Sequence, residues 1–485
     1  MTSNTKMAKC VMVLGTTSGA GKSWLTTALC RWYARQGLKV APFKAQNMSN
    51  NARVVSGGEI GSAQYFQALA ARAEPEVRMN PLLLKPERDT HSQVVLLGRV
   101  DEALSRMAWR GRSASVWPQI SRALDELRAE NDVVVIEGAG SPAEINLMDS
   151  DIVNMRVAMH CDARCLLVTD IDRGGAFAHL YGTWALLPEQ ERALIHGFVL
   201  NKFRGDAGLL APGPQMLQEL TGIPTVATLP MWWRHGLPEE DGVFDDRSVT
   251  SGAITRTIAV VAYPRISNLD EFQPLRNVPG VRLVWARSAG DVAGADWIIL
   301  PGSKHTSGDL AWLRAQGLDR AIADHAGRGG TVLGVCGGLQ MLGEALIDPH
   351  GIDGNGPGLG LLPLVTVFEQ EKTVQRTQQA FGTLGGPWAA LSGLSVRGYE
   401  IHHGRSAQHA GMAAAQAVLP DQLGWQNAQG NVLGVYLHGL FEDPAVLQTL
   451  FGAKVPTLDS VFDGLADFID THFDSGVLPD LIRDP

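Results

Sequence analysis

The sequence predicts an α/β protein built from two doubly wound, mainly parallel sheets, one in each half of the chain. Short runs of Val, Ile and Leu, among them residues 93–97, alternate with segments of helical length from residue 10 to about 230, and a second alternating series begins near residue 258. Glycines and polar residues directly follow several of these runs. Continuous apolar strands with helices between them are typical of sheets covered on both faces, whose functional groups gather at the carboxyl ends of the strands.

The composition limits the class of protein. A chain of 485 residues is long enough for about two to three domains. Its formal net charge of -9 argues against nucleic-acid binding on a diffuse basic surface, and no apolar run reaches the roughly 18 to 20 residues that cross a bilayer. Five cysteines without metal-type spacing indicate a reducing compartment. We therefore expect a cytoplasmic protein without nucleic-acid or membrane partners, and the sequence leaves its oligomeric state open.

A glycine-rich stretch joins the first apolar run, residues 10–14, to a helix-like segment at 24–36. In such a loop, backbone N–H groups point at phosphate oxygens, a lysine neutralises phosphate charge, and a serine hydroxyl meets Mg²⁺. Five residues separate Gly15 from Gly21, where the usual motif has four. The predicted ATP-binding residues of this loop are Gly15, Thr16, Gly19, Gly21, Lys22 and Ser23.

Two more strand ends in the first half carry polar side chains. Glu137 comes directly after the run 133–136 and before two glycines, where a carboxylate would meet Mg²⁺ bound to ATP phosphates. A solvated loop acid is the alternative. Asn201 follows the run 197–200, and its amide can read an adenine edge, although an ordinary turn asparagine is the alternative. We predict Ser23 and Glu137 as the Mg²⁺ ligands.

Several polar side chains in the first half have no role in an ATP site. Residues 47–51 are dense in amides, which bond carboxylates and amides without adding net charge. This composition suits a large polar substrate, and an asparagine-rich loop built on side-chain turns is the alternative. The residues assigned to such a substrate are Gln46, Asn47, Asn50, Glu59, Asn146 and Asp149.

The composition changes in the middle of the chain. Between about residues 238 and 255 the sequence becomes acidic and polar and loses its hydrophobic period, which is typical of a domain boundary. We predict a first domain at residues 1–238, a linker at 239–255 and a second domain at 256–485.

One cysteine of the second half lies between an apolar strand and a helix. Cys336 follows the run 332–335 and precedes two glycines, as a nucleophile does on a sharp strand-to-helix turn. The helix N-terminus favours the thiolate, and the next backbone N–H can bind an oxyanion. A histidine after a later apolar strand can serve as the base. The predicted catalytic residues are Cys336 and His438, with an oxyanion hole formed by Gly337 and Gly302.

An ATP-type domain followed by a Cys/His domain resembles a glutamine-dependent amidotransferase. The strings at residues 43–51, 137–147, 300–304 and 398–402 are similar to those of the cobyric acid synthase family, and this resemblance covers essentially the whole chain. It implies a P-loop NTPase-like domain similar to dethiobiotin synthetase, which shares the longer phosphate loop. It also implies a class I, triad-type glutamine amidotransferase domain.

The resemblance implies ATP- and glutamine-dependent amidation of the b, d, e and g carboxylates of adenosylcobyrinic acid a,c-diamide through acyl phosphates, in cobalamin biosynthesis. Mg²⁺ is the implied cofactor, and ATP, glutamine and a corrinoid are the implied substrates. Lys44 is then expected to share the charge of the transferred phosphate, and Gln340 matches a glutamine-contacting position of this class. Because free ammonia would be protonated in water, we expect a protected route between the domains.

One position departs from the triad-type pattern. Those enzymes usually carry a Glu two residues after the catalytic histidine, where this chain has Leu440, and Glu442 is no obvious substitute. We therefore predict a Cys336–His438 dyad whose histidine is oriented by another group. Two rival functions remain at this point. A cobyrinic acid a,c-diamide synthase has the same domain order, although the string 47–51 favours the later enzyme. A non-enzymatic ATP-switch protein would need neither Cys336 nor His438.

Overall fold

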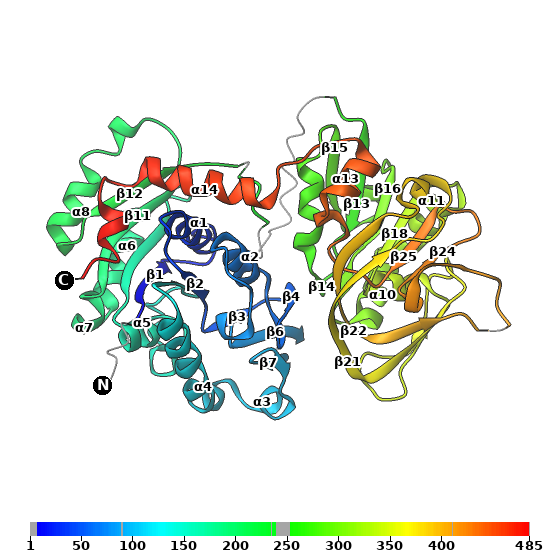
Figure 1. Cartoon of the computed structure of the whole chain (residues 1–485), viewed down its shortest axis with the longest axis horizontal. Helices are drawn as coiled ribbons and strands as arrows, with labels where there is room; N and C mark the ends of the chain where they lie inside the picture. Colours follow the sequence, from blue (N-terminus) through cyan, green and yellow to red (C-terminus); the bar gives the residue numbers. More distant parts are fainter. Residues whose placement is uncertain (1–6, 89–90, 234, 239–252, 410, 485) are drawn as a thin grey trace.

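The computed structural model describes residues 7–88, 91–233, 235–238, 253–409 and 411–484. It shows two lobes side by side, each built around its own sheet (Figure 1). The predicted α/β class with mainly parallel sheets is confirmed. Of the predicted linker 239–255, residues 239–252 lie outside the described part of the chain.

The first lobe contains a six-stranded parallel sheet in the order β12-β11-β10-β1-β9-β2. Alternate residues of β1 face two different cores, with Val11 and Val13 in one and Met12 and Leu14 in the other. A strand buried on both faces must be apolar throughout, which explains the continuous runs in the sequence. The strands are β1 (Lys9–Gly15), β2 (Val40–Phe43), β9 (Val133–Glu137), β10 (Arg164–Asp170), β11 (Ile195–Phe203) and β12 (Thr225–Pro230).

Helices cover both faces of this sheet (Figure 1). Buried residues of α1 and α2 join the core of Val11, and buried residues of α4, α5, α6 and α8 join the core of Met12. The described helices of this part of the chain are α1 (Lys22–Arg35), α2 (Ser62–Ala70), α3 (Glu102–Arg106), α4 (Trp109–Glu130), α5 (Met155–Cys161), α6 (Ala176–Leu186), α7 (Glu189–Arg192) and α8 (Gly213–Thr221).

Two small β structures lie on the side of this lobe that faces the second lobe (Figure 1). The apolar run at residues 93–97, expected among the alternating strands of the main sheet, falls instead in β7, which pairs antiparallel with β6 in a separate sheet. Only Val94 and Val95 of β7 are buried, so this strand lacks the two-sided burial of a central parallel strand. The small sheet contains β3 (Gln46–Met48), β6 (Leu82–Arg88), β7 (His91–Leu96) and β8 (Arg99–Val100), and a hairpin joins β4 (Ala52–Val55) to β5 (Gly58–Gly61).

The second lobe is built on a seven-stranded sheet in the order β15-β13-β16-β18-β25-β24-β23. Its first five strands are parallel to one another. Strand β24 pairs antiparallel with β25, and β23 pairs antiparallel with β24. The strands are β13 (Arg256–Val261), β15 (Val281–Ala286), β16 (Trp297–Leu300), β18 (Thr331–Val335), β23 (Gln416–Leu419), β24 (Gly424–Gln426) and β25 (Val432–Val435). The helices are α9 (Ala289–Val292), α10 (Thr306–Ala315), α11 (Leu318–Gly327), α12 (Gly337–Leu342) and α13 (Pro444–Phe451).

A long hairpin and several short segments complete this lobe. The hairpin strands β21 (Val365–Ala380) and β22 (Ser395–Ala407) form a second sheet with β19 (Ala345–Ile347) and β20 (Gly356–Pro357). A two-stranded ladder pairs β14 (Ile266–Ser267) with β17 (Gly302–Ser303), and a 3₁₀ segment, η4 (Leu269–Asn277), follows β14.

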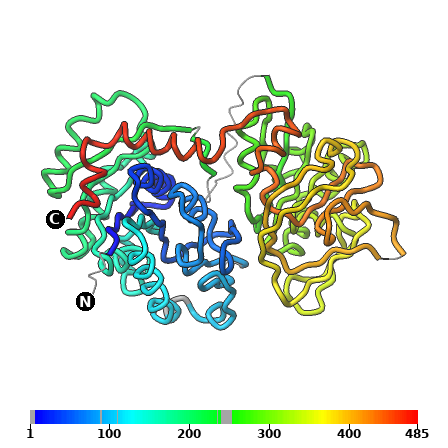
Figure 2. The backbone as a smooth tube through the Cα atoms, in the orientation of Figure 1, coloured from blue at the N-terminus to red at the C-terminus, as the bar shows by residue number. Residues whose placement is uncertain are grey.

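The last two helices return to the first lobe (Figures 1 and 2). Phe462, Leu465 and Ile469 of α14 (Leu458–His472) share a core with α1, and Trp32 Nε1 donates to Asp470 at 2.7 Å. The region predicted as one second domain, 256–485, is therefore divided, because α14 and α15 (Val477–Asp480) pack with the first domain. A terminal amphipathic helix can close either core, and its periodicity does not say which. Among the described residues, no helix has the length and apolar character that a membrane crossing requires.

Candidate active sites

The glycine-rich loop connects the end of β1 to the start of α1 at the carboxyl edge of the first sheet. Lys22 folds back over this loop, and its Nζ donates to the carbonyl oxygens of Thr17 at 3.0 Å and Gly140 at 3.1 Å. A Cβ at Gly15 would lie 2.9 Å from Lys22 Nζ. A Cβ at Gly21, where φ is 100°, would lie 2.1 Å from Asn201 Nδ2. The loop thus needs glycine at both positions for its lysine and its neighbour to fit.

Glu137 lies at the end of β9, next to this loop, and is 1% exposed. Its Oε1 accepts from Ser23 Oγ and from Lys44 Nζ, both at 2.8 Å, and its Oε2 accepts from Gln67 Nε2 at 2.5 Å. Burial alone would raise the pKa of Glu137, but the charge of Lys44 and these hydrogen bonds hold the pKa below its usual value. A charged carboxylate therefore faces a serine hydroxyl at the mouth of the loop.

This pair of oxygen ligands fits Mg²⁺. The ion prefers oxygen donors and commonly takes only one or two from the protein, with phosphates and waters completing its shell. Ser23 Oγ and Glu137 Oε1 are already within 2.8 Å of each other, and both face the phosphate loop. The described residues contain no cluster of three or more His, Cys, Asp or Glu that would form an all-protein metal site.

Three other predicted ATP-site residues make hydrogen bonds within the loop or between the loop and the neighbouring strands. Asn201 Nδ2 donates to the carbonyl of Ala20 at 2.8 Å, so its amide holds the loop rather than projecting away from it. Thr16 Oγ1 donates to Thr169 Oγ1 at 2.9 Å. Gly19 has φ 75°, and its carbonyl accepts from Lys202 Nζ at 2.8 Å. The structure brings all the predicted ATP-site residues to one edge of the sheet.

The residues predicted to bind a large polar substrate fall in three places. Gln46 and Asn47 are buried on β3, and Asn47 Nδ2 donates to Gln64 Oε1 at 3.1 Å. Asn146 and Asp149 are exposed on the loop that follows Glu137, and Asn50 lines a cavity between the lobes.

Glu59 was also predicted to bind the large polar substrate, but it lies in an ion cluster between the lobes. It is 1% exposed, and its two oxygens accept from Lys85 of its own lobe and from Lys372 Nζ of the second lobe, the latter at 2.6 Å. Burial would raise the pKa of Glu59, but the charges of the two lysines outweigh burial and hold the pKa below its usual value. The carboxylate is thus occupied by a buried ion cluster between the lobes and is not open to a substrate.

Cys336 occupies a sharp turn between β18 and α12, with φ 51° and ψ -107°. Its N–H donates to the carbonyl of Val435 at 2.8 Å, which ties the turn to β25. A Cβ at Gly338 would lie 1.8 Å from the carbonyl oxygen of Leu300, and a Cβ at Gly337 would lie 2.8 Å from the backbone nitrogen of Ser303. The two glycines therefore let α12 approach the strand ends closely, as a nucleophile elbow requires.

His438 lies beside Cys336, just beyond the end of β25. Its Nδ1 is 2.8 Å from Oε1 of Glu271, and Oε2 of Glu271 accepts from the N–H of Gly439 at 2.7 Å. Burial lowers the pKa of His438, but the charges of Glu271 and Cys336 and the hydrogen bonds to both raise it to about 10. The group that orients His438 is therefore Glu271, which the sequence analysis missed.

Glu271 belongs to η4, far from His438 in the sequence. In the sequence, Asp270 and Glu271 lie between the apolar residues Leu269 and Phe272. All four residues are buried. Charged side chains are rarely buried unless they are paired, so this stretch carries a weak sign of a buried charged site.

Gly302 and Gly337 both lie at this site. A Cβ on Gly302 would come within 2.9 Å of His438 Cε1, and Gly337 packs against Ser303 next to it. Gln340 projects from α12, and its Oε1 accepts from Thr306 Oγ1 at 3.1 Å, while its Nε2 donates to Tyr436 at 3.3 Å. The structure thus brings the predicted glutaminase residues together around Cys336.

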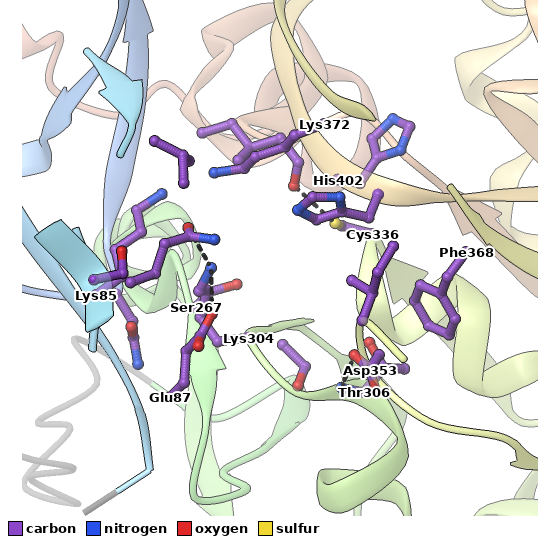
Figure 3. Close-up of a pocket in the computed structure, with 18 of the residues that line it drawn as sticks. Lys85, Glu87, Ser267, Lys304, Thr306, Cys336, Asp353, Phe368, Lys372 and His402 are labelled. Carbon is purple, nitrogen blue, oxygen red and sulfur yellow. Dashed lines mark hydrogen bonds and ion pairs between the residues drawn. The ribbon is translucent and has the colours of Figure 1, made fainter. Parts of the chain in front are cut away.

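A cavity of about 720 Å³ lies between the lobes and reaches Cys336, Gln340 and His438. Figure 3 shows Lys85 of the first lobe and Lys304, Lys372 and Cys336 of the second around the same hollow. Burial and the charge of Lys372 lower the pKa of Lys304 to about 8. Lysines of both lobes therefore line the cavity, together with the acids Glu87 and Asp353.

Comparison with known proteins shows which domain family each lobe matches. Residues 11–240 match the CobQ/CobB/MinD/ParA nucleotide binding domain, and residues 257–446 match the CobB/CobQ-like glutamine amidotransferase domain. With the phosphate loop and the Cys–His–Glu arrangement, these matches define a glutamine-hydrolysing carbon–nitrogen ligase.

Close relatives narrow this class to one family. The chain is 80% identical to the cobyric acid synthase of Variovorax paradoxus (strain S110), over 98% of this chain and 99% of the relative. It is 78% identical to the cobyric acid synthase of Polaromonas naphthalenivorans (strain CJ2), with the same coverage. The chain belongs to the cobyric acid synthase family.

Proposed function

We propose that this enzyme transfers the amide nitrogen of glutamine to the b, d, e and g carboxylates of adenosylcobyrinic acid a,c-diamide in cobalamin biosynthesis, and that it uses ATP to form acyl phosphates. The observation that carries this proposal is the presence of two different sites in one chain. One is the Lys22, Ser23 and Glu137 site, and the other is the Cys336–His438 site on an interlobe cavity. The names of the relatives support the choice of product.

In the second lobe, the Cys336 thiolate attacks the side-chain carbonyl of glutamine. The N–H groups of Gly337 and Gly302 stabilise the oxyanion, and the His438 imidazolium gives its proton to the departing ammonia. Glu271 holds the Nδ1–H, so that Nε2 is the nitrogen that exchanges the proton. Water then attacks the thioester with His438 as base, which releases glutamate and restores the thiol. Gln340 is proposed to contact the bound glutamine.

In the first lobe, a substrate carboxylate attacks the γ-phosphorus of ATP, which yields an acyl phosphate and ADP. The loop N–H groups, Lys22 and Lys44 stabilise the charge on the transferred phosphoryl group. Ser23 and Glu137 would hold Mg²⁺, which when bound supplies neutralisation of phosphate charge. Ammonia then attacks the acyl carbon, and inorganic phosphate leaves as the amide forms.

The polar side chains near the phosphate loop are the proposed corrinoid contacts. Gln46 and Asn47 lie on β3, Asn146 and Asp149 lie on the loop that follows Glu137, and Asn50 lies at the cavity. Because peripheral corrin carboxylates and amides both accept and donate hydrogen bonds, these uncharged amides suit them. The buried ion cluster removes Glu59 from this set.

The cavity supports a protected passage for ammonia. It extends from Cys336 to Asn50 and Lys85 of the first lobe. We propose that ammonia released at Cys336 crosses this cavity to reach the first lobe. We also place the enzyme in the cytoplasm, because its five cysteines are free thiols.

The test is Cys336→Ser, assayed by mass spectrometry with cobyrinic acid and with its a,c-diamide as acceptors. We expect glutamine-dependent amidation to disappear and ammonium-dependent amidation to persist. Survival of both activities would refute the glutaminase assignment. Wild-type amidation of cobyrinic acid at a and c alone would instead identify the diamide synthase, and the absence of any amidation would support the ATP-switch protein.

A further inference from the structure

Arg53 of the first lobe is buried against acids of the second lobe. It lies on β4 and is 1% exposed. Its Nη2 donates to Asp270 Oδ2 and to Glu442 Oε1, each at 2.5 Å, and its Nη1 donates to the hydroxyl of Tyr399. One guanidinium therefore bridges three side chains from η4, β22 and the segment after β25.

Each partner of Arg53 adjoins the His438–Glu271 pair. Asp270 directly precedes Glu271 in the chain. The ring of Tyr399 stacks on the imidazole of His438 with centroids 5.2 Å apart and planes at 16°, and the two residues exchange backbone hydrogen bonds of 2.9 and 3.3 Å. The N–H of Glu442 donates to the carbonyl of Gly439 at 3.0 Å, and the N–H of Gly439 bonds Glu271. Arg53 thus contacts the immediate neighbours of both residues while touching neither.

The backbone beside Arg53 is docked to the same segment. The N–H of Ala52 donates to Asn268 Oδ1 at 3.0 Å, and Asn51 Oδ1 accepts from the N–H of Leu269 at 2.9 Å. Asn268 Nδ2 in turn donates to the hydroxyl of Tyr399 at 3.0 Å. The start of η4, which leads directly to Glu271, is therefore held in place by residues 51–53 of the first lobe.

The charges of Arg53, Asp270 and Glu442 explain why this contact between the lobes must stay intact. Burial raises the pKa of Glu442 to about 7 and also raises the pKa of Asp270, while Arg53 opposes both shifts. Without the guanidinium, the fully buried carboxyl group of Asp270 and the partly exposed carboxyl group of Glu442 would lose their cation beside Glu271. They would have to take up protons or move apart, and either response displaces the groups that orient His438.

We propose that Arg53 is a positioning residue through which the ATP-binding lobe holds the glutaminase histidine and its glutamate in their active geometry. This inference rests on the proposed glutaminase function of Cys336. Glutamine hydrolysis then depends on contact with the lobe that consumes the ammonia. The segment that carries Arg53 leads into α2, whose Gln67 bonds Glu137, so one continuous stretch of the chain links the two sites.

The experiment compares Arg53→Met and Arg53→Lys in the full-length enzyme with Arg376→Met as the matched control. Arg376 also crosses between the lobes, since its Nε donates to the carbonyl of Val54 at 3.1 Å and its Nη1 bonds Glu74 at 2.9 Å, but neither contact adjoins His438 or Glu271. For each protein, kcat and KM of glutamine hydrolysis are measured, together with ammonium-dependent amidation as a readout of the first lobe.

We expect Arg53→Met to lower kcat for glutamine hydrolysis at least about tenfold, because small displacements of catalytic groups cost rate, while KM changes less than about threefold. Ammonium-dependent amidation should persist. Arg53→Lys should recover part of the loss, because it keeps the charge but lacks the planar fork that bridges several acceptors. Arg376→Met should hydrolyse glutamine as the wild type does.

Wild-type kcat in Arg53→Met, or an equal loss in Arg376→Met, would overturn the inference. Loss of ammonium-dependent amidation in both Arg53 variants would also overturn it, because the role would then be structural. These outcomes are distinct from failure of the proposed function, in which Cys336→Ser itself would retain glutamine hydrolysis.

Discussion

Oε1 of Glu271 lies 2.8 Å from Nδ1 of His438, although 167 positions separate the two residues in the chain. The second oxygen of the same carboxylate accepts from the N–H of Gly439, so Glu271 fixes both the ring and the backbone that carries it. Leu440, at the position where triad-type glutaminases usually carry their glutamate, is fully buried in the apolar core. The orienting acid has thus come from a different element of the same lobe.

Glu271→Gln should lower glutamine hydrolysis by about 10² to 10⁴-fold, because it removes the charge that orients and stabilises the imidazolium. Glu271 raises the pKa of His438, so the variant should lose the His438 proton at lower pH, and the basic limb of the kcat/KM profile should move to lower pH. The measurement is glutaminase activity from pH 6 to 10. Glu369→Gln, at a half-exposed acid on β21, is the control. An unshifted basic limb in Glu271→Gln would contradict this role.

Glu137→Gln should abolish amidation with both glutamine and ammonium as nitrogen donors, because both routes need the same activated carboxylate. Glutamine hydrolysis should persist, since Glu137 does not contact the Cys336 site. The two assays are run side by side with Glu144→Gln, a change at an exposed acid on the loop after β9. Amidation at the wild-type rate in Glu137→Gln would remove it from the ATP site.

Gly21→Ala should weaken ATP binding by at least about tenfold, equal to about 1.4 kcal/mol, because the added Cβ would lie 2.1 Å from Asn201 Nδ2 and displace the loop. Gly37→Ala is the matched control, since Gly37 also has positive φ but has no atom within 4 Å of the added Cβ. Both variants should lose about 1 to 2 kcal/mol of stability from the left-handed backbone. Titration calorimetry with ATP separates the two effects, and equal ATP affinities in the two variants would contradict the prediction.

Truncation after residue 456 should destabilise the first lobe rather than the second. It removes Phe462, Leu465 and Ile469 from the core that they share with α1, and burial of three such side chains contributes about 5 kcal/mol or more. Differential scanning calorimetry and limited proteolysis should show the first lobe melting or being cleaved at lower temperature. Removal of residues 483–485 alone should have little effect. If the truncated first lobe melted as the intact one does, the terminal helices would not belong to its core.

Much of the fold and of the candidate site could be predicted from the sequence. The strands β1, β9 and β18 are buried on both faces, so their residues are apolar without interruption and the next polar residue marks the strand end. That rule led to Glu137 and Cys336, and the glycine-rich motif after β1 led to Lys22. The same rule misplaced the run 93–97, because an apolar run of that length also suits a half-buried hairpin strand.

The sequence alone determined the phosphate loop, the carboxylate at the end of β9 and the cysteine turn. Each depends on a few consecutive residues whose backbone geometry and spacing carry the chemistry. Only the tertiary structure showed that Glu271 orients His438 and that Arg53 contacts the neighbours of this pair. It also showed that lysines form ion pairs with Glu59 and that α14 packs into a core of the first lobe. Those features depend on contacts between distant segments. A buried charge needs an opposite charge nearby, and an apolar helix face needs a core to pack against. The local sequence shows each of these needs but does not identify the distant residues that meet it.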